Sequence, residues 1–277
     1  MSPHPVAEVC RVLGVGRATA YRAVRPRGPH YTRGVDRVVA AQIRAIIGTR
    51  ASYGYRRVTA LVNTRFGTRY NRKRIRRVMA LWGWTLPVRA RRRNGRPHRG
   101  LIRRPCSDER WCSDGFEIAC WNGEVVQVGF ALDCHDREAL AHVAAVGRDL
   151  AGADIQELMR RAVAGRFGGR RPPRPVQWLS DNGSIYTALE TLVVAERLGL
   201  TPITTPAASP ESNGMAEAFV ATMRRDYLDG ADLSTAAAVL DQLDGWFADY
   251  NGVAPHSALG FKSPWEYRSA QGPRVVS

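Results

Sequence analysis

The sequence predicts an all-α helix-turn-helix region followed by an α/β domain with a mixed sheet. Three observations support this prediction. Apolar residues recur at helical spacing in the first third of the chain, strand and helix patterns alternate from about residue 110, and the net charge changes sign between the two parts. We therefore expect a helix-turn-helix region in residues 1–88, a basic linker in 89–107 and the α/β domain in 108–277.

The charge asymmetry indicates a partner for the front region. Residues 1–105 contain 26 Lys and Arg against Glu8 and Asp36, a local charge of +24, whereas the rest of the chain contains 15 Lys and Arg against 23 acids. Nucleic acid is the default partner of such a region, because each neutralised phosphate releases a counterion. The sequence has no apolar run of membrane-spanning length and no basic helix with an aromatic or leucine face, so we expect no membrane partner.

The cysteines and the N-terminal residues indicate a cytoplasmic location. The five cysteines are odd in number and none stands in a C-x-x-C pair, which disfavours a disulfide framework and a structural zinc site. The first residues lack the charged start and long apolar core of a signal peptide. We expect reduced thiols in a cytoplasmic protein.

Helices are predicted throughout the front region. Residues 5–24 form a helix-turn-helix pattern, which many small helical hairpins share. Residues 36–47 and 55–66 carry apolar side chains at helical spacing, and Asn71 is placed to cap a further helix. Residues 89–105 are rich in arginine, contain Pro and Gly, and lack periodicity, which indicates a linker that lies on phosphates.

The helix after Asn71 has one strongly basic face. Five of its first six residues are cations and none is an acid, so the charges would repel one another on an isolated helix. A solvated charged face is the usual interpretation of such a run, but this repulsion and the local charge favour contact with DNA. The side chains that we expect on the DNA are Arg72, Lys73, Arg76 and Arg77.

Strand and helix patterns alternate in the second part of the chain. Residues 138–146 fit either element, because their composition favours a helix and their neighbours favour a strand. Three hairpin strands followed by alternating helices and strands give a sheet with mixed strand directions. Strands are predicted over 111–120, 124–133, 175–181 and 200–206, and helices over 154–167, 187–199, 209–228 and 235–250.

Three acids stand where such a sheet would expose its side chains. Asp114 lies in the first strand, Asp181 directly after the fourth and Glu217 in the helix after the fifth. Sites in open sheets form at strand ends, and two-metal phosphoryl transfer needs a few carboxylates that converge on Mg²⁺. Spacing alone does not establish this site, because the chain has 25 acids, both aspartates precede common turn residues, and Glu217 also fits an exposed helical position.

The sequence motifs around these acids resemble the Asp-Asp-Glu core of bacterial insertion-sequence transposases. They read WCSDGFEIACWNGE, WLSDNGSIYTA and SPESNGMAEAF, with thirty-five residues between Asp181 and Glu217. The tail YNGVAPHSALGFKSPWEY is similar to that family's C-terminal signature, and YGYRRVTALVNTRFGTRYNRKRIRRVM to its helix-turn-helix module. The similarity is to the OrfB-type product of elements related to retroviral integrases, and it extends from about residue 5 to Tyr267.

This resemblance implies a fold, an activity and a cofactor. The implied catalytic domain is RNase H-like, with Asp114, Asp181 and Glu217 as catalytic residues and metal ligands, and with Mg²⁺, or Mn²⁺ in its place, as cofactor. The implied activity is DNA strand cleavage by water followed by strand transfer through the 3′-OH. The implied partners are the terminal repeats of the element, target DNA, further copies of this chain, and an upstream-frame product joined by frameshifted fusion. The implied location is the bacterial cytoplasm, in association with the nucleoid.

The sequence departs from the family pattern at two places. The first acid stands in W-C-S-D-G-F-E instead of the commoner W-x-T-D, and the usual Lys seven residues after the glutamate is Arg224. Seven residues make two helical turns, so we expect Arg224 on the face of Glu217, about 10 Å along, where it would hold DNA near the reactive phosphate. A plain surface arginine paired locally is the alternative.

Two other functions compete with the transposase. One is a catalytically inactive relic or regulator that binds DNA through residues 1–105, and the intact set of three acids argues against it. The other is a plain RNase H-type nuclease that cuts without strand transfer, and the basic front region and the family-like tail argue against it.

Several other residue types are expected to have structural roles. Cys134, His135 and His142 lack zinc-ligand spacing, so we expect them in the core or on the surface. The sequence does not disclose the role of His256. The tryptophans expected to pack against the sheet are Trp111, Trp121 and Trp178.

Overall fold

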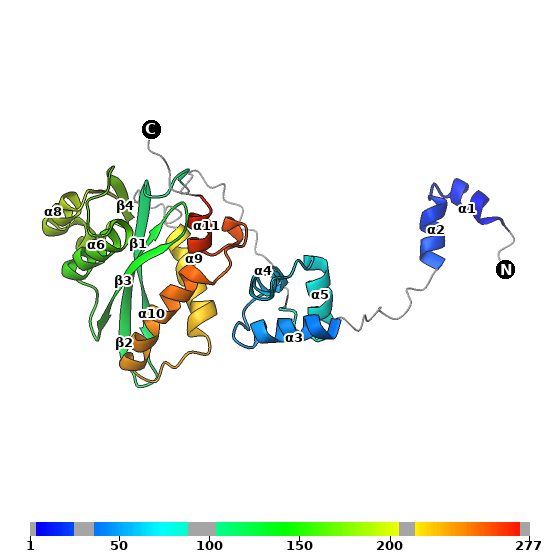
Figure 1. The fold of residues 1–277 in the computed structure, drawn as a ribbon, viewed down its shortest axis with the longest axis horizontal. Coiled ribbons are helices and arrows are strands. Elements are labelled where there is room, and N and C mark those ends of the chain that lie inside the picture. Colours follow the sequence, from blue (N-terminus) through cyan, green and yellow to red (C-terminus); the bar gives the residue numbers. More distant parts are fainter. Residues whose placement is uncertain (1–3, 25–35, 88–103, 205–213, 272–277) are drawn as a thin grey trace.

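The computed structural model describes residues 4–24, 36–87, 104–204 and 214–271. A five-stranded mixed sheet with helices on both faces forms the second part of the chain, and helices alone form the first part (Figure 1). The predicted order, a helical region before an α/β domain, is confirmed.

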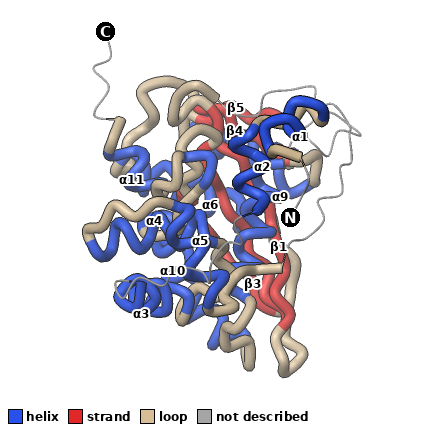
Figure 2. Tube along the Cα trace, turned by 90° about the vertical axis from the view of Figure 1, so that its right-hand side faces the viewer, coloured by secondary structure: helices blue, strands red, loops and turns tan. Residues whose placement is uncertain are grey.

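The sheet has the strand order β3-β2-β1-β4-β5. Strands β1 (Arg110–Ala119), β2 (Val125–Asp133) and β3 (Ala139–Val146) form an antiparallel meander. Strand β4 (Val176–Ser180) pairs parallel with β1, and β5 (Leu200–Thr204) pairs parallel with β4. Figure 2 shows the strands side by side with helices around them.

The segment that the sequence left open between helix and strand is strand β3. It pairs with β2 from Val126 opposite Val146 to Leu132 opposite Ala139, with an irregularity next to Ala131. Its alanines favour a helix locally, but local propensity is a weak bias, and pairing in the sheet overrides it.

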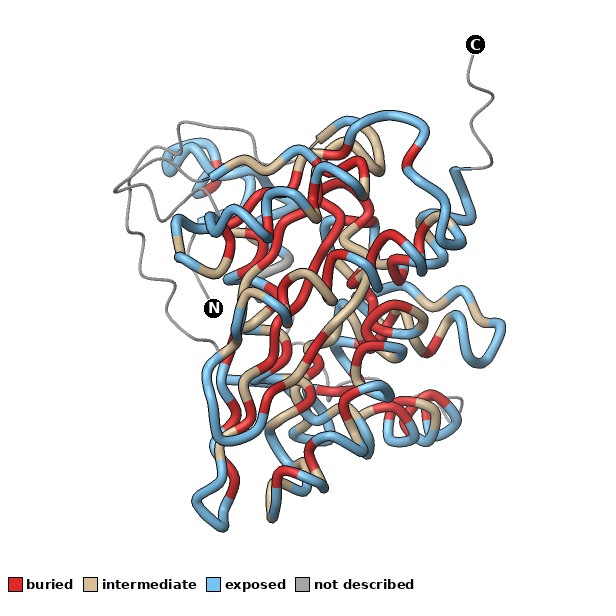
Figure 3. The backbone as a smooth tube through the Cα atoms, turned by 90° about the vertical axis from the view of Figure 1, so that its left-hand side faces the viewer, coloured by how far each residue is buried: buried red, intermediate tan, exposed pale blue. Residues whose placement is uncertain are grey.

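Helices cover both faces of the sheet. Helices α6 (Gly152–Phe167) and α8 (Leu189–Arg197) pack on one face, and α9 (Gly214–Met223) and α10 (Ala236–Gly252) on the other. Alternate residues of β1 serve the two cores, because successive side chains of a strand point to opposite faces. The buried residues therefore lie in the sheet and on the sides of the helices that face it (Figure 3).

Short elements connect and close this domain. They are α7 (Ser184–Thr187) after β4, the π-helical turn η2 (Arg224–Leu228) after α9, the 3-10 turn η3 (Ser257–Leu259), and α11 (Pro264–Ser269). Helix α11 begins at a capping box in which the Ser263 hydroxyl accepts from the backbone N–H of Glu266.

Arg166 forms a buried ion cluster at one end of the sheet. Its fully buried guanidinium donates to Asp108 at 2.7 Å and Asp136 at 2.6 Å, and it also pairs with Glu138. These acids belong to the segment before β1 and the turn between β2 and β3. Since a buried cation needs such partners, the cluster fixes α6 against both segments.

The two ends of the described catalytic domain meet at one imidazole next to this cluster. The Nδ1 atom of His135 lies 2.8 Å from the backbone oxygen of Arg104, and its Nε2 atom lies 3.0 Å from the side-chain nitrogen of Gln271. The carbonyl can only accept, so Nδ1 donates to it and Nε2 accepts from Gln271. The expectation of a structural role for His135 is confirmed.

The expectation for the tryptophans is right for two of the three. Trp111 and Trp178 are buried in the core under α6. Trp121 is 71% exposed, so the prediction that it packs against the sheet is wrong. Strand β1 ends at Ala119, and Trp121 therefore lies in the hairpin turn, beyond the last residue whose side chain the sheet covers.

The front region contains the predicted helices. Helices α1 (Val6–Val12) and α2 (Arg17–Val24) flank a turn in which Gly14 has a positive φ of 63°. Helices α3 (Asp36–Ile47), α4 (Tyr55–Phe66) and α5 (Arg72–Leu81) share one apolar core, and we refer to them as the trihelical module.

The cap predicted for α5 is present. The side chain of Asn71 accepts from the backbone N–H of Lys73 at 2.8 Å. Most of the predicted linker lies outside the described residues, and its last residues already contact the catalytic domain, where Arg104 donates to Gln177 and Ser107 to Asp136. Among the described helices, none is long and apolar enough to cross a membrane.

The trihelical module binds the catalytic domain through buried ion pairs. Arg57 donates to Asp226 in η2 at 2.6 Å, Ser52 donates to the same carboxylate at 2.5 Å, and Arg50 donates to Asp249 in α10 at 2.7 Å. We refer to these five residues as the junction cluster. The Asp226 side chain is only 1% exposed, so the module is held at a fully covered position.

The charge state of the junction cluster is fixed by its hydrogen bonds. Burial opposes the charge of Asp226, but hydrogen bonds from Arg225, Arg57 and Ser52 lower its pKa to about 2. The ring of Tyr53, also buried, lies 3.8 Å from the guanidinium carbon of Arg57. Asp226 is therefore ionised at neutral pH.

Candidate active site

Strand β1 places Asp114 on the face of the sheet that α9 covers. Asp114 lies opposite Phe130 of β2, and its neighbours two residues away, Cys112 and Phe116, belong to the core beneath α9 and α10. Side chains two residues apart share a face, so Asp114 points toward the same helices. It is half-buried, and its Oδ1 atom accepts from the backbone N–H of Gly115 at 2.8 Å.

The register of β1 and β4 brings Asp181 next to Asp114. The last parallel pair of these strands is Cys112 with Leu179, and each aspartate follows its strand's member of this pair by two residues. Because neighbouring strands lie about 4.8 Å apart, equal offsets from one pair place both carboxylates at the same end of the sheet. Asp181 is exposed, and its Oδ1 atom accepts from the backbone N–H of Gly183 at 3.0 Å.

Glu217 reaches the aspartates from the first turn of α9. The buried side of this helix includes Ala216 and Phe219, while Glu217 is exposed. The pKa of Asp114 is raised, first by burial and then by the charges of Asp181 and Glu217. The charges of Asp181 and Glu217 therefore both act on Asp114.

The described side chains do not form a closed metal cage. No group of three or more His, Cys, Asp or Glu among the described residues is arranged tightly enough to hold an ion. Like charges without a cation repel, which favours the more open arrangement. All three acids offer only oxygen, the ligand type that Mg²⁺ prefers, so the donor set fits a hard divalent cation.

A buried tyrosine that the sequence did not single out lies beside the two aspartates. The hydroxyl of Tyr186 in α7 lies 3.1 Å from the hydroxyl of Ser113 in β1, and both residues are buried. Burial, followed by the charges of Asp114 and Asp181, raises the pKa of Tyr186. Tyr186 thus fastens the segment after Asp181 to β1. Its only sequence signal is its place five residues after Asp181.

The basic face of α5 is partly neutralised by a distant acid. Asp36 in α3 pairs with Arg74 at 3.1 Å and with Arg77 at 3.2 Å. No local pattern predicts these pairs, since Asp36 and the two arginines are about forty residues apart in the sequence. Arg72, Lys73 and Arg76 are exposed and have no carboxylate partner among the described residues, and Arg77 is still 42% exposed.

Arg224 lies at the boundary between α9 and the π-helical turn η2. Residues up to Met223 are α-helical, and Arg224, the first residue of η2, is exposed. Its neighbour Arg225 pairs instead with Asp226 at 2.7 Å, on the edge of the junction cluster. The two arginines therefore have different surroundings.

His256 has a structural position that the sequence did not disclose. Its ring packs edge-on against Tyr250 at 4.5 Å between centroids, and its Nε2 atom lies 3.3 Å from the backbone oxygen of Tyr250. Burial lowers the pKa of His256 to about 4, so the ring is uncharged at neutral pH. His256 thereby anchors the turn that leads to Lys262, with which it forms an isolated β-bridge.

Comparison with known families supports both parts of the chain. Residues 104–210 and 198–264 match integrase core domain families, and residues 35–93 match an HTH-like domain. The fold and the comparison thus define an enzyme with an integrase core and a DNA-binding helical region.

Curated relatives name the family. The chain is 41% identical over 274 residues to the transposase InsD of insertion element IS2D from Escherichia coli, covering 95% of this chain and 90% of that protein. It is 48% identical over 179 residues to the uncharacterized protein of insertion element IS136 from Agrobacterium fabrum, covering 65% of this chain and 92% of that protein. The chain belongs to the insertion-element transposases, which are enzymes of the Asp-Asp-Glu type.

A solved structure supports the fold assignment. The chain resembles a chain of the simian T-cell lymphotropic virus intasome in complex with PP2A regulatory subunit B56 gamma, with a TM-score of 0.51 and 16% identity. The match covers 86% of this chain and 76% of that one. At this identity the likeness concerns the fold alone, and it agrees with the expected RNase H-like, integrase-type catalytic domain.

Proposed function

We propose that this transposase cleaves and joins DNA at one centre formed by Asp114, Asp181 and Glu217. The observation that carries the proposal is the common offset of the two aspartates from the pair Cys112–Leu179, because it brings two carboxylates from adjacent strands to one end of the sheet. Glu217 adds a third from α9, and its charge contributes to the raised pKa of Asp114. A plain structural role would not require three acids that destabilise one another.

The three carboxylates would hold Mg²⁺, or Mn²⁺ in its place. When bound, such ions activate the attacking oxygen and stabilise the leaving oxygen during phosphoryl transfer. The chain supplies the positioning. Strand β1 fixes Asp114, the N–H of Gly183 orients the carboxylate of Asp181, and the buried contact of Tyr186 with Ser113 holds the segment after β4.

DNA would approach the enzyme along its exposed cations. We propose that element ends bind to Arg72, Lys73, Arg76 and Arg77 on α5, and that Arg224 contacts the strand near the reactive phosphate. The local charge of +24 in residues 1–105 supports this arrangement. We further propose target DNA as the second substrate, assembly of several copies on DNA, an upstream-frame product as a fusion partner, and a place on the bacterial nucleoid.

Substitution of each acid tests the centre. Asp114→Asn, Asp181→Asn and Glu217→Gln should each abolish cleavage and joining of labelled end DNA in Mg²⁺, while binding stays nearly intact, because only the metal-holding oxygens change. Asp229→Asn, at an exposed acid after η2, is the control and should cut normally. Wild-type cutting by any of the three variants would show that its acid is wrongly assigned.

The same assay separates the competing functions. A joined product identifies a transposase, a cut product without joining identifies a plain nuclease, and bound but uncut DNA identifies a relic or regulator. An integrase core and an HTH-like region occur together in this chain, and this combination favours the first outcome.

A further inference from the structure

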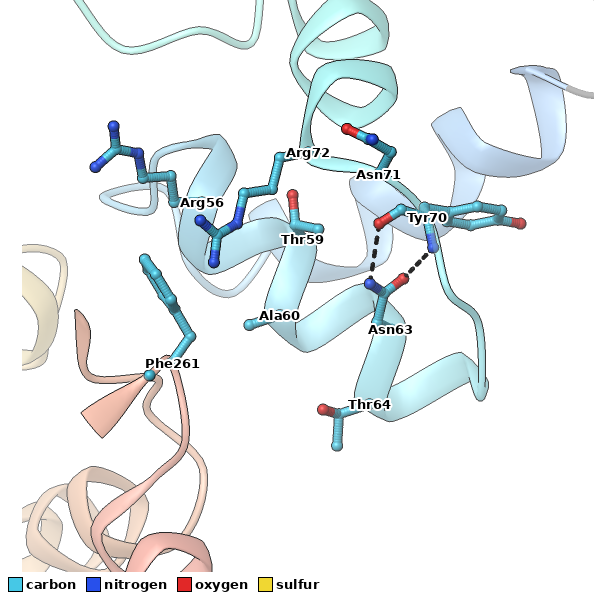
Figure 4. A pocket seen from close by; sticks show the side chains of 10 residues that line it. Arg56, Thr59, Ala60, Asn63, Thr64, Tyr70, Asn71, Arg72 and Phe261 are labelled. Atoms are coloured by element: carbon cyan, nitrogen blue, oxygen red, sulfur yellow. Dashed lines mark hydrogen bonds between the residues drawn. The ribbon is translucent and has the colours of Figure 1, made fainter. Parts of the chain in front are cut away.

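A pocket separate from the three acids lies where the trihelical module meets the catalytic domain. Its volume is about 500 Å³, and its walls come from α4, the start of α5 and the turn at residues 260–261 (Figure 4). Arg56 and Arg72 line it from the module, and Phe261 lines it from the catalytic domain. The pocket therefore exists only when both parts of the chain are together.

Phe261 is held in the pocket in a strained conformation. Its φ is +70°, which is unusual for a bulky aromatic residue. Its backbone N–H donates to the carbonyl of His256 at 2.8 Å, and the bridge of His256 with Lys262 closes the turn. Strain of this kind persists where the surroundings enforce it, and it concentrates at functional sites. In Figure 4 the ring extends from the turn toward Arg56 and Arg72.

The two arginines of the pocket differ from their neighbours in lacking an acid. Arg57 pairs with Asp226 and Arg74 with Asp36, whereas neither Arg56 nor Arg72 has a carboxylate within ion-pair distance among the described residues. The guanidinium carbon of Arg72 lies 4.6 Å from the centre of the Phe261 ring. The pocket thus combines un-neutralised cations with an aromatic ring.

We propose that this pocket binds one unpaired nucleotide of a DNA strand, with its base on the ring of Phe261 and its phosphates on Arg56 and Arg72. Aromatic rings with adjacent cations bind single strands in this way, because every base has a face that stacks and every nucleotide has a phosphate. A base inside a duplex is already stacked and cannot enter. The proposal rests on the proposed DNA-binding function and adds a ligand class and a site to it.

The proposal predicts a preference that duplex binding alone does not produce. The full chain should bind an end duplex with a short single-stranded overhang on the order of ten-fold more tightly than the same duplex with a blunt end. Stacking should also change the fluorescence of 2-aminopurine placed in the overhang. Both quantities are measured by titration, the first from anisotropy of a labelled duplex.

Substitution of Phe261 is the main test. Phe261→Gly removes the ring but adopts a positive φ freely, so it should fold at least as well as the wild type. It should abolish the ten-fold preference and the 2-aminopurine signal while blunt-duplex binding stays unchanged, and Phe261→Trp should retain both effects. Phe66→Ala is the matched control, since Phe66 is an exposed ring beside Arg65 in the same module but outside this pocket.

Each other outcome overturns the proposal. If Phe261→Gly weakens binding of the overhang duplex and of the blunt duplex equally, Phe261 is a contact of duplex DNA. If it weakens binding of neither duplex, the pocket does not bind a nucleotide. An equal effect of Phe66→Ala would show that any exposed ring suffices. If the wild-type chain binds neither duplex, the proposed DNA-binding function is contradicted as well. If it binds the two duplexes equally, only the proposed nucleotide pocket is contradicted.

Discussion

Asp114 is half-buried beside two other acids, and this position determines how pH acts on the metal-free protein. Burial and then the charges of Asp181 and Glu217 raise its pKa in the folded state. A carboxyl with a raised folded pKa binds more protons when folded, so its contribution to stability is present below the unfolded pKa and is lost as pH rises through the raised value. Above that raised pKa the ionised Asp114 therefore destabilises the metal-free fold.

Asp114→Asn should raise the melting temperature of the metal-free protein at pH 7 by a few degrees. The amide removes the charge that burial and the neighbouring acids oppose, and the gain should be smaller at a second, acidic pH below the raised pKa of Asp114, where the wild type takes up its proton. Added Mg²⁺ should stabilise the wild type more than the variant. Thermal unfolding at both pH values is the measurement, and a lower melting temperature of the variant at pH 7 would contradict this account.

Gly183→Ala tests the orientation of the second aspartate. A Cβ atom at Gly183 would lie 3.0 Å from Oδ1 of Asp181, so that carboxylate would have to shift, although the backbone φ of −60° suits alanine. Misplacing a catalytic group by a fraction of an ångström to an ångström costs on the order of 100-fold in rate. Single-turnover cleavage should fall by about this factor with folding unchanged. Gly245→Ala, with open space around its Cβ, is the control.

Individual residues show where sequence reasoning succeeds and where it stops. The three acids were singled out because motifs typical of the family surround them, and the Asn71 cap was predicted because capping is a local pattern. Tyr186 and Asp36 were missed, since each acts on residues far away in the sequence. Such contacts exist only once the fold brings the segments together, and no local pattern marks them.

At the scale of elements, helix α9 and the turn η2 connect the proposed catalytic centre to the module interface. Glu217 lies in the first turn of α9, Arg224 begins η2, and Asp226 two residues later enters the junction cluster. A π-helical turn is rare and often marks a functional position. The sequence predicted one continuous α-helix over 209–228, of which residues 209–213 lie outside the described part of the chain, and the change to a π-helical turn at Arg224 was not predicted.

Arg224→Ala should lower strand transfer by pre-cut ends, and Arg224→Lys should restore much of it, because a point cation still holds a phosphate. Arg225→Ala cannot serve as a neutral control, since Arg225 pairs with Asp226. Arg197→Ala, at an exposed arginine of α8 on the opposite face of the sheet, is the better comparison. The measurement is joining in Mg²⁺, and equal small effects of both alanine changes would leave Arg224 as a surface residue.

At the scale of the whole molecule, the junction cluster joins the DNA-binding module to the catalytic domain. The paired residues of this cluster lie far apart in the sequence. Arg57 and Asp226, for example, are separated by 169 residues. The sequence predicted both parts but not their contact, because polar pairs leave no periodic signal. The depressed pKa of Asp226 means that the contribution of this pair is fully present above about pH 4 and is lost as pH falls toward 2.

Asp226→Asn should separate the two parts of the molecule functionally. Loss of the Asp226 charge leaves Arg57, whose side chain is only 20% exposed, without its carboxylate, and should therefore destabilise the contact between the two parts. We expect thermal unfolding to change from one transition to two, with DNA binding kept and cleavage reduced. Arg148→Ala removes an exposed pair with Asp154 and should change little. A single transition with wild-type cleavage in Asp226→Asn would show that the module is not held by this cluster.

The meeting of Arg104 and Gln271 on His135 has a consequence for how such a domain is reused. Both ends of the described catalytic domain contact the two nitrogens of one imidazole, so the domain begins and finishes at one place. A domain with adjacent ends can be inserted into another chain, or have its ends joined and new ones opened elsewhere, without stretching its core. Residues 104 and 271 lie close enough together for such an insertion or joining.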